Sequence, residues 1–292
     1  MTPPATAHGI MAHYFTTPGA RRVQGALTLE DWERGLDAYG PRLISARDWI
    51  RRALDGTVED AVCVTVDDGL REGLLALPSL TARGLTAAWN LYTQPYVGVL
   101  PSLERDRWMR NQFASVEAFY DAVDAILETT FDREKAIGYL ADYGYLSQRD
   151  REFRYWRDRW ATPTQYERLM DRVAMTHGLT CSLSLDHWLT PFEVFTLQGD
   201  GHLIGNHSHS HPMTMERLPV SAQILEYATA QWILDHLAPI DDLHTVSYPC
   251  GSTTPELQRW LQVQGYQLAW GATMDGTIPW TTPRWSTGYW TR

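Results

Sequence analysis

The chain has 292 residues with 25 basic and 35 acidic side chains, which gives a formal net charge of −10 at pH 7. Nucleic acid and anionic membrane surfaces attract basic proteins, so we expect neither as a partner. The length suits one large domain or two small ones, and a hydrophobic content of 44% suits a sizeable core. Of these two, we predict a single domain over residues 1–292.

Short apolar, β-branched runs alternate with longer amphipathic segments, the pattern of β-α units around a parallel sheet or barrel. The expected strands are Gly9–Phe15, Ala61–Val66, Thr86–Tyr92, Leu179–Leu185, His202–Asn206, His244–Tyr248 and Tyr266–Trp270. The expected helices are Thr28–Tyr39, Ala46–Leu54, Val220–Leu237 and Pro255–Gln264. Thr254 and Pro255 favour a helix start, because threonine caps a helix well and proline suits its first position.

Residues 100–175 differ from this pattern, since they are charged, aromatic and helical in period, without a clear strand. We predict a helical insertion between two strands of the α/β unit. An insertion of this size commonly either caps an active site or forms an oligomer contact, and the second role would make the protein a homo-oligomer. Its aromatic side chains either line a substrate pocket or pack its own core; the candidates are Phe153, Tyr155, Trp156 and Trp160.

Two adjacent aspartates, Asp67 and Asp68, follow the strand expected at Ala61–Val66 and precede Gly69. Ligands bind at strand ends in parallel α/β architectures. Two like charges side by side are costly unless a cation or hydrogen bonds offset them. The stretch therefore predicts either a cation site or an ordinary Asp-Asp-Gly turn.

Three of the chain's ten histidines stand at alternating positions, His207, His209 and His211, after another expected strand. In a strand all three share one face, and in a helical turn His207 and His211 share one, so these two can converge on one ion in either case. Imidazole is a common zinc ligand, and an aspartate completes a mixed site. Three protein ligands leave a position for water, as a catalytic zinc site requires.

A third segment, Tyr248-Pro249-Cys250-Gly251, also follows an expected strand. Its composition is typical of a loop turn. Alternatively, a backbone N–H presented next to a metal, here that of Cys250, can stabilise a developing oxyanion.

In combination and order, these three segments resemble the motifs of the polysaccharide deacetylase family, carbohydrate esterase family 4, whose members are metal-dependent N-deacetylases of amino sugars and relatives that act on other C–N bonds. The resemblance implies a distorted (β/α) barrel of about seven parallel strands. It also implies that Asp68, His207 and His211 hold the metal and that Asp67 is the general base. His209 falls at a position that is not a ligand.

Two departures point to one branch of the family. Ser247 stands where many members carry an arginine, and no histidine follows His244 to supply the usual late general acid. His13, at the end of the first expected strand, is similar to the acid of the poly-N-acetylglucosamine deacetylase branch, which also lacks that arginine. We therefore assign His13 as the general acid. The segment Pro283–Trp285 resembles a Pro-Arg strand of the family, but we assign Arg284 no role.

The expected cofactor is Zn²⁺, although two histidines and an aspartate also accept Co²⁺, Ni²⁺ or Fe²⁺. The scattered cysteines, the lack of a membrane-length apolar segment and an N-terminus without a signal-peptide pattern predict a cytoplasmic protein. An N-acetylated small molecule or sugar is then the expected substrate, contacted by Tyr248, Pro249, Trp156 and Trp160. The alternatives are deformylation, opening of a cyclic amide or ureide, or a non-catalytic role in binding metal or carbohydrate.

Overall fold

The computed structural model describes residues 4–16, 25–127, 133–141, 143–144, 146–238, 241–274 and 281–286. These residues divide into two units, one made by the described parts of 4–99 and 185–286 and the other by those of 100–184. Among the helices of these ranges, none is long and apolar enough to cross a membrane.

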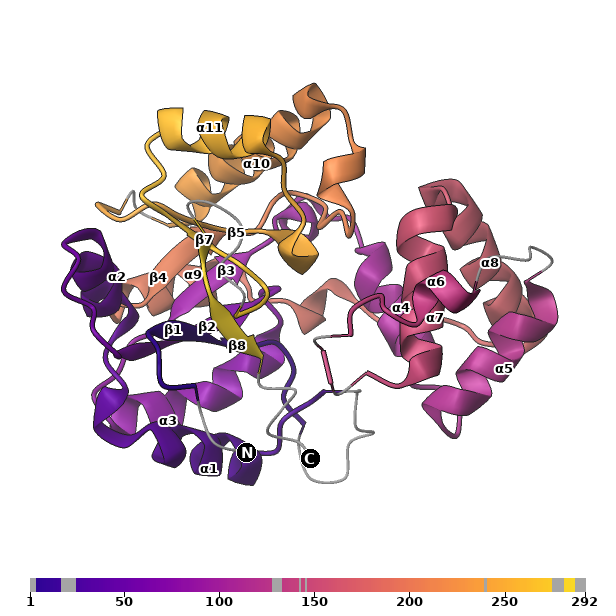
Figure 1. Ribbon diagram of the computed structural model, residues 1–292, viewed down its shortest axis with the longest axis horizontal. Helices are drawn as coiled ribbons and strands as arrows, with labels where there is room; N and C mark the ends of the chain where they lie inside the picture. The colour runs from indigo at the N-terminus through magenta and orange to yellow at the C-terminus, as the bar shows by residue number, and fades with distance from the viewer. Residues whose placement is uncertain are drawn as a thin grey trace. The chain divides into compact units, whose positions relative to one another are not determined.

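Short parallel strands form one sheet in the first unit (Figure 1). Their order is β7-β6-β5-β4-β3-β2-β1-β8. The bounds are β1 His8–Ala12, β2 Val62–Asp67, β3 Ala88–Leu91, β4 Leu203–Asn206, β5 Thr245–Ser247, β6 Leu268–Trp270, β7 Thr281–Thr282 and β8 Arg284–Ser286. Every neighbouring pair is parallel.

The two outermost strands of this order close the barrel, because only Pro283 separates β7 from β8 along the chain. The Gly271 N–H donates to Thr282 O (2.9 Å) on the side of β6, and the Gly9 N–H donates to Pro283 O (3.1 Å) on the side of β1. Residues 281–286 therefore act as one interrupted strand between β6 and β1. The predicted (β/α) barrel of seven parallel strands is confirmed.

The strand expected at Leu179–Leu185 is wrong. Residues 179–184 have no regular structure, none of them is buried, and a short 3₁₀ turn follows at Leu185–His187. The alternating leucines and polar residues are typical of a half-buried strand. In a closed barrel, however, each strand already has a neighbour on both sides, so no edge is free to pair with this segment.

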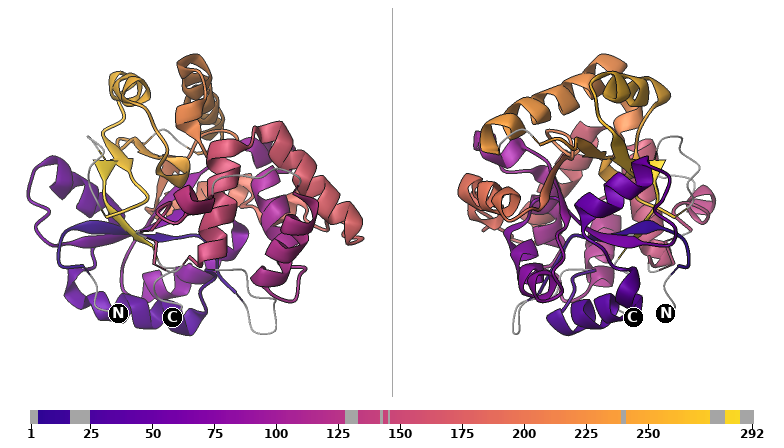
Figure 2. Two further views of the ribbon diagram at one scale, coloured as in Figure 1. Left: turned by 45° about the vertical axis from the view of Figure 1, so that its right-hand side comes forward. Right: turned by 90° about the vertical axis from the view of Figure 1, so that its left-hand side faces the viewer.

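Helices surround the barrel (Figure 2). The helices of this unit are α1 Leu29–Tyr39, α2 Ala46–Leu54, α3 Leu77–Ala82, α9 Pro191–Gly199, α10 Val220–Leu237 and α11 Pro255–Val263. The four predicted helices are confirmed to within one residue at each end. Helix α1 begins where it does because Thr28 and Asp31 cap it reciprocally: Thr28 Oγ1 accepts the Asp31 N–H at 3.0 Å, and Asp31 Oδ2 accepts the Thr28 N–H at 3.3 Å.

Alternation along the strands decides which side chains enter the barrel. In β2 the three valines pack with the apolar core under the helices, while Cys63, Thr65 and Asp67 face the other way. Thr65 Oγ1 and Asp67 Oδ1 both accept hydrogen bonds from Arg284, a residue of β8 on the far side of β1. The barrel interior is therefore polar toward its carboxyl end, where the candidate site lies.

The second unit contains helices and no strand among its described residues. Its helices are α4 Ser102–Arg110, α5 Val116–Ile126, α6 Arg133–Ala136, α7 Gln148–Tyr155 and α8 Pro163–Thr176. Trp156 is buried in this unit, with its ring 6.4 Å from those of Phe153 and Tyr166, whereas Trp160 is 47% exposed. Trp156 thus packs the core of the unit, and a role of either tryptophan toward substrate stays a prediction.

Candidate metal centre and active site

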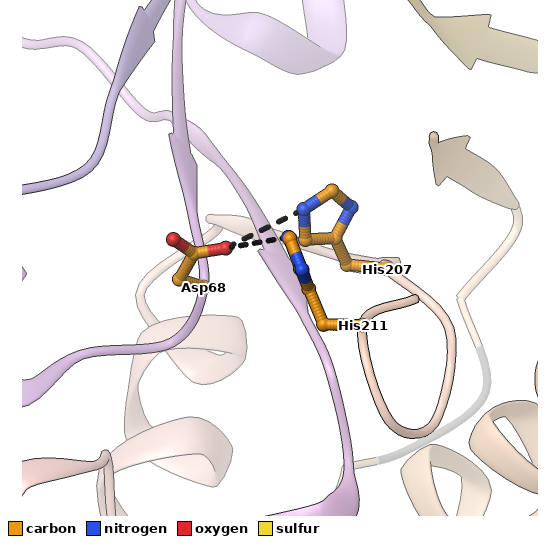
Figure 3. Close-up of side chains that lie close together, drawn as sticks. All are labelled: Asp68, His207 and His211. Atoms are coloured by element: carbon orange, nitrogen blue, oxygen red, sulfur yellow. Dashed lines mark ion pairs between the residues drawn. The ribbon is translucent and has the colours of Figure 1, made fainter. Parts of the chain in front are cut away.

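Three buried side chains meet at the carboxyl end of the barrel strands (Figure 3). Asp68 directly follows β2, His207 directly follows β4, and His211 lies four residues further along. The Nε2 atoms of His207 and His211 lie 3.5 and 3.3 Å from Asp68 Oδ1. One ligand atom of each residue lies within 4.8 Å of the others, so the three can share one ion.

Several residues in and next to this cluster have a left-handed backbone conformation. Asp68, Ser208, His211 and Cys250 have φ angles of 73°, 68°, 56° and 53°. They are four of the six non-glycine residues with positive φ in the described chain. Each left-handed residue of this kind costs about 1–3 kcal/mol and persists only where the surrounding structure holds it. They lie in the three motif loops, so the surrounding structure must hold these loops in place.

Hydrogen bonds and packing orient both histidines. His207 Nδ1 lies 3.0 Å from Ser247 O, which leaves Nε2 directed at Asp68. The His211 ring packs edge-on against Tyr92, with 5.5 Å between ring centroids. The Tyr92 hydroxyl in turn accepts a hydrogen bond from Trp188 Nε1 at 2.8 Å. Such outer contacts fix the ring orientation of metal-binding histidines.

The donor set fits a divalent transition metal. Two imidazole nitrogens and one carboxylate oxygen are the ligands that catalytic zinc sites use, with a further position left open. Burial alone would raise the pKa of Asp68, but hydrogen bonds from His207 and His211 hold it well below its ordinary value. The carboxylate is therefore ionised, as a metal ligand must be.

A second carboxylate, that of Asp67, lies beside this cluster but faces the barrel interior. Its Oδ2 atom is 3.9 Å from both His207 Nε2 and His13 Nε2. Its Oδ1 atom accepts hydrogen bonds from Arg284 Nη1 (2.8 Å) and Asn90 Nδ2 (2.7 Å). Burial alone would raise the pKa of Asp67, but the charges of Arg284 and two nearby histidines lower it to about 2.

Arg284 is one of two residues next to Asp67 to which the sequence analysis gave no role. It is buried in β8, and besides Asp67 it bonds Ser247 Oγ through Nη2 at 2.8 Å and Gly271 O through Nε. Gly9 makes room for it, because a Cβ at this position would lie 3.1 Å from Arg284 Cγ. The one available signal was the segment Pro283–Trp285, which resembles a Pro-Arg strand of the family.

Asn90 was also missed, although an asparagine inside the apolar run of β3 is itself a signal. Its amide orientation depends on Gly205 in the neighbouring strand β4. A Cβ on Gly205 would lie 2.2 Å from Asn90 Oδ1 and 2.8 Å from Thr245 Oγ1. The missing side chain thus leaves space for the amide that donates to Asp67.

His13 directly follows β1, which pairs with β2 on the side away from β3. The His13 ring approaches the Asp67 carboxylate from that side. Its side chain is 26% exposed, so a substrate can approach it, while Nε2 stays 3.9 Å from Asp67 Oδ2. Glu72 fixes the segment that carries it, since Glu72 Oε1 accepts the Phe15 N–H at 3.0 Å. Burial raises the pKa of Glu72 to about 7.

The remaining predicted residues lie in two places. His209 turns away from the metal cluster, and its Nδ1 lies 2.9 Å from Thr93 Oγ1. Tyr248 and Pro249 are buried at the third motif, and Cys250 is exposed in its left-handed conformation. Roles of these three residues toward substrate or oxyanion remain predictions.

The first unit is thus a (β/α) barrel that carries a cluster of one aspartate and two histidines able to hold a metal ion, beside a second carboxylate. The family model described as Polysaccharide deacetylase matches residues 172–269, a range that holds His207, His211 and the third motif. This match confirms the resemblance to the polysaccharide deacetylase family that the three motifs predict. A comparison with curated proteins finds no match.

Solved deacetylase structures share the fold at low identity. The Streptococcus pyogenes deacetylase PplD in complex with acetate is 12% identical, with a TM-score of 0.55 over 98% of this chain and 93% of that one. IcaB from Ammonifex degensii is 14% identical, with a TM-score of 0.53 over 96% and 91%. The BpsB deacetylase domain from Bordetella bronchiseptica is 11% identical, with a TM-score of 0.50 over 96% of each chain. The comparisons therefore give a match to the polysaccharide deacetylase family model over residues 172–269 and a fold shared with these structures.

Proposed function

We propose that the chain is a metal-dependent hydrolase that removes the N-acetyl group from an amino sugar or from a small molecule that contains one. The observation that carries this proposal is the position of Asp67 Oδ2, which lies 3.9 Å from Nε2 of His207 and 3.9 Å from Nε2 of His13. Hydrolysis of an amide needs a base for the attacking water and an acid for the leaving amine, and these two groups meet that need.

Asp68, His207 and His211 would hold the metal. When bound there, a divalent ion such as Zn²⁺, Co²⁺, Ni²⁺ or Fe²⁺ polarises an amide carbonyl and lowers the pKa of a water molecule. Asp67 accepts the proton of the attacking water through Oδ2. Its other oxygen is held by Arg284 and Asn90, which keep the carboxylate ionised and fix its direction.

His13 donates a proton to the leaving amine. A positioned acid of this kind contributes about 10²–10⁴-fold to the rate. The backbone N–H of Cys250 stabilises the oxyanion of the tetrahedral intermediate, and one donor of this type is worth about 3–4 kcal/mol. Tyr248 and Pro249 border the acyl group in this arrangement.

Acetate release tests the proposal. The substrates are soluble N-acetylated amino sugars, their short oligomers, sugar nucleotides and aminoglycoside-like pseudodisaccharides, each given to zinc-loaded wild-type protein and to His13→Ala. We expect acetate from at least one class of substrate and a rate about 10²–10⁴-fold lower in His13→Ala at equal metal content. Metal-bound protein that releases no acetate would move the function to another amide or to binding, and full activity of His13→Ala would place the acid elsewhere.

A further inference from the structure

The loop between the two histidine ligands contains two of the four left-handed non-glycine residues of the three motif loops. It runs from His207 to His211, and two of its residues, Ser208 and His211, are left-handed. Five consecutive N–H groups need acceptors. His207, Ser208 and His211 are buried, where an unpaired N–H costs about 1–3 kcal/mol, and His209 and Ser210 are half-buried. How this loop pairs its N–H groups therefore decides whether both imidazoles can reach Asp68.

Three of these N–H groups donate to acceptors in the neighbouring strands or in the loop itself. The His207 N–H donates to Leu91 O in the neighbouring strand at 3.0 Å. The Ser208 N–H donates to Asn206 Oδ1 at 2.9 Å, and the His211 N–H donates to Ser208 Oγ at 3.2 Å. These bonds come from the sheet or from the loop itself.

The other two N–H groups share one charged acceptor from a different element. Glu226 lies in α10, and its Oε2 atom accepts the His209 N–H at 3.0 Å and the Ser210 N–H at 2.7 Å. Its Oε1 atom accepts the Ser210 hydroxyl at 2.7 Å. Consecutive backbone N–H groups that converge on one anionic oxygen form the arrangement that proteins use to bind anions. Here the anion is a side chain of the protein.

The same loop is also held by residues that follow β3, through backbone bonds and through the Thr93 hydroxyl, which lies 2.9 Å from His209 Nδ1. The Thr93 and Gln94 N–H groups donate to His209 O at 3.1 and 2.9 Å, and these residues follow β3. Glu226, by contrast, supplies a charged contact to the loop backbone. Hydrogen bonds to an ionised acceptor are roughly twice as strong as neutral ones, so this contact dominates the fixation of the loop.

We propose that Glu226 is a positioning residue of the metal centre. Its carboxylate holds the His207–His211 loop in the strained conformation that brings both Nε2 atoms to Asp68, and it does so without contacting the metal or the substrate. This inference rests on the proposed metal site. It predicts that metal affinity depends on a residue in a helix outside the three motifs.

Cobalt binding tests this inference without any substrate. Metal-free wild-type protein, Glu226→Gln and Glu226→Ala are titrated with Co²⁺, whose visible absorption reports the geometry of its ligands. Glutamine keeps the size of the side chain but has only one accepting oxygen and no charge. We expect Co²⁺ affinity to fall about 10–100-fold in Glu226→Gln, as for other residues that orient ligands, further in Glu226→Ala, and the absorption band to change.

Asp235→Asn is the matched control. Asp235 is an exposed acid in the same helix, and its Oδ1 atom accepts a hydrogen bond from Gln231 Nε2 at 2.7 Å rather than from the loop. We expect it to bind Co²⁺ as wild type does. Unchanged Co²⁺ affinity and spectrum in Glu226→Gln, whether or not the melting temperature of the metal-free protein falls, would overturn the inference. A wild-type protein that binds no Co²⁺ would instead overturn the metal site itself.

Discussion

Asp67→Asn is expected to lower deacetylation by at least about 100-fold while the protein still binds its metal. Asparagine has nearly the shape of aspartate, but its amide cannot accept the proton of the attacking water, and removal of a catalytic base costs about 10²–10⁴-fold. The metal stays because Asp68, His207 and His211 remain in place. Acetate release at saturating substrate, normalised to bound metal, measures the effect.

The adjacent aspartate provides the contrast for this experiment. Asp68→Asn changes the same functional group one residue further along, but at a position where Oδ1 faces both histidines at 3.3 and 3.5 Å. We expect this variant to lose metal as well as activity. An Asp67→Asn protein that keeps more than about a tenth of its turnover would show that Asp67 is not the base.

Arg284→Met is expected to lower the free energy of unfolding by about 3–5 kcal/mol, because it leaves the buried Asp67 carboxylate without its charged partner. Both side chains are almost fully buried, and Nη1 lies 2.8 Å from Asp67 Oδ1. Methionine fills much of the space but replaces none of the hydrogen bonds. Urea-induced unfolding, followed by far-ultraviolet circular dichroism, measures the loss.

Two further variants make this prediction specific to the pair. Arg259→Met removes an exposed arginine of α11 that pairs with Glu256 at 3.1 Å, and we expect a change below about 1 kcal/mol. In Asp67→Asn/Arg284→Met the uncompensated charge is gone, so the loss should be clearly smaller than the sum of the two single losses. Additivity within about 0.5 kcal/mol would contradict a coupled pair.

Local patterns predicted much of the fold and the metal cluster. The helix bounds follow from capping residues such as Thr28 and Asp31, which act within a few residues of each other. The metal cluster could be predicted because strand ends of parallel sheets meet at one edge, so Asp68 and the two histidines are brought together by topology.

The missed features depend on contacts between distant parts of the chain. Arg284 lies 217 residues from Asp67, in a strand interrupted by Pro283, and proline argues against a strand in any local pattern. Ser247 stands where many family members carry an arginine, and Arg284 reaches its hydroxyl from β8, so the charge next to Asp67 comes from a different strand. The false strand at 179–185 failed for the opposite reason, because its local pattern was suitable but the closed barrel had no free edge.

Metal content is the most direct test of whether Asp68, His207 and His211 form a catalytic metal centre. Wild-type protein, His207→Ala and His209→Ala are purified in parallel, loaded with Zn²⁺, dialysed and analysed by mass spectrometry for bound metal. We expect about one ion per chain in wild type and in His209→Ala, whose ring instead contacts Thr93, and almost none in His207→Ala. Full metal occupancy in His207→Ala would contradict the site.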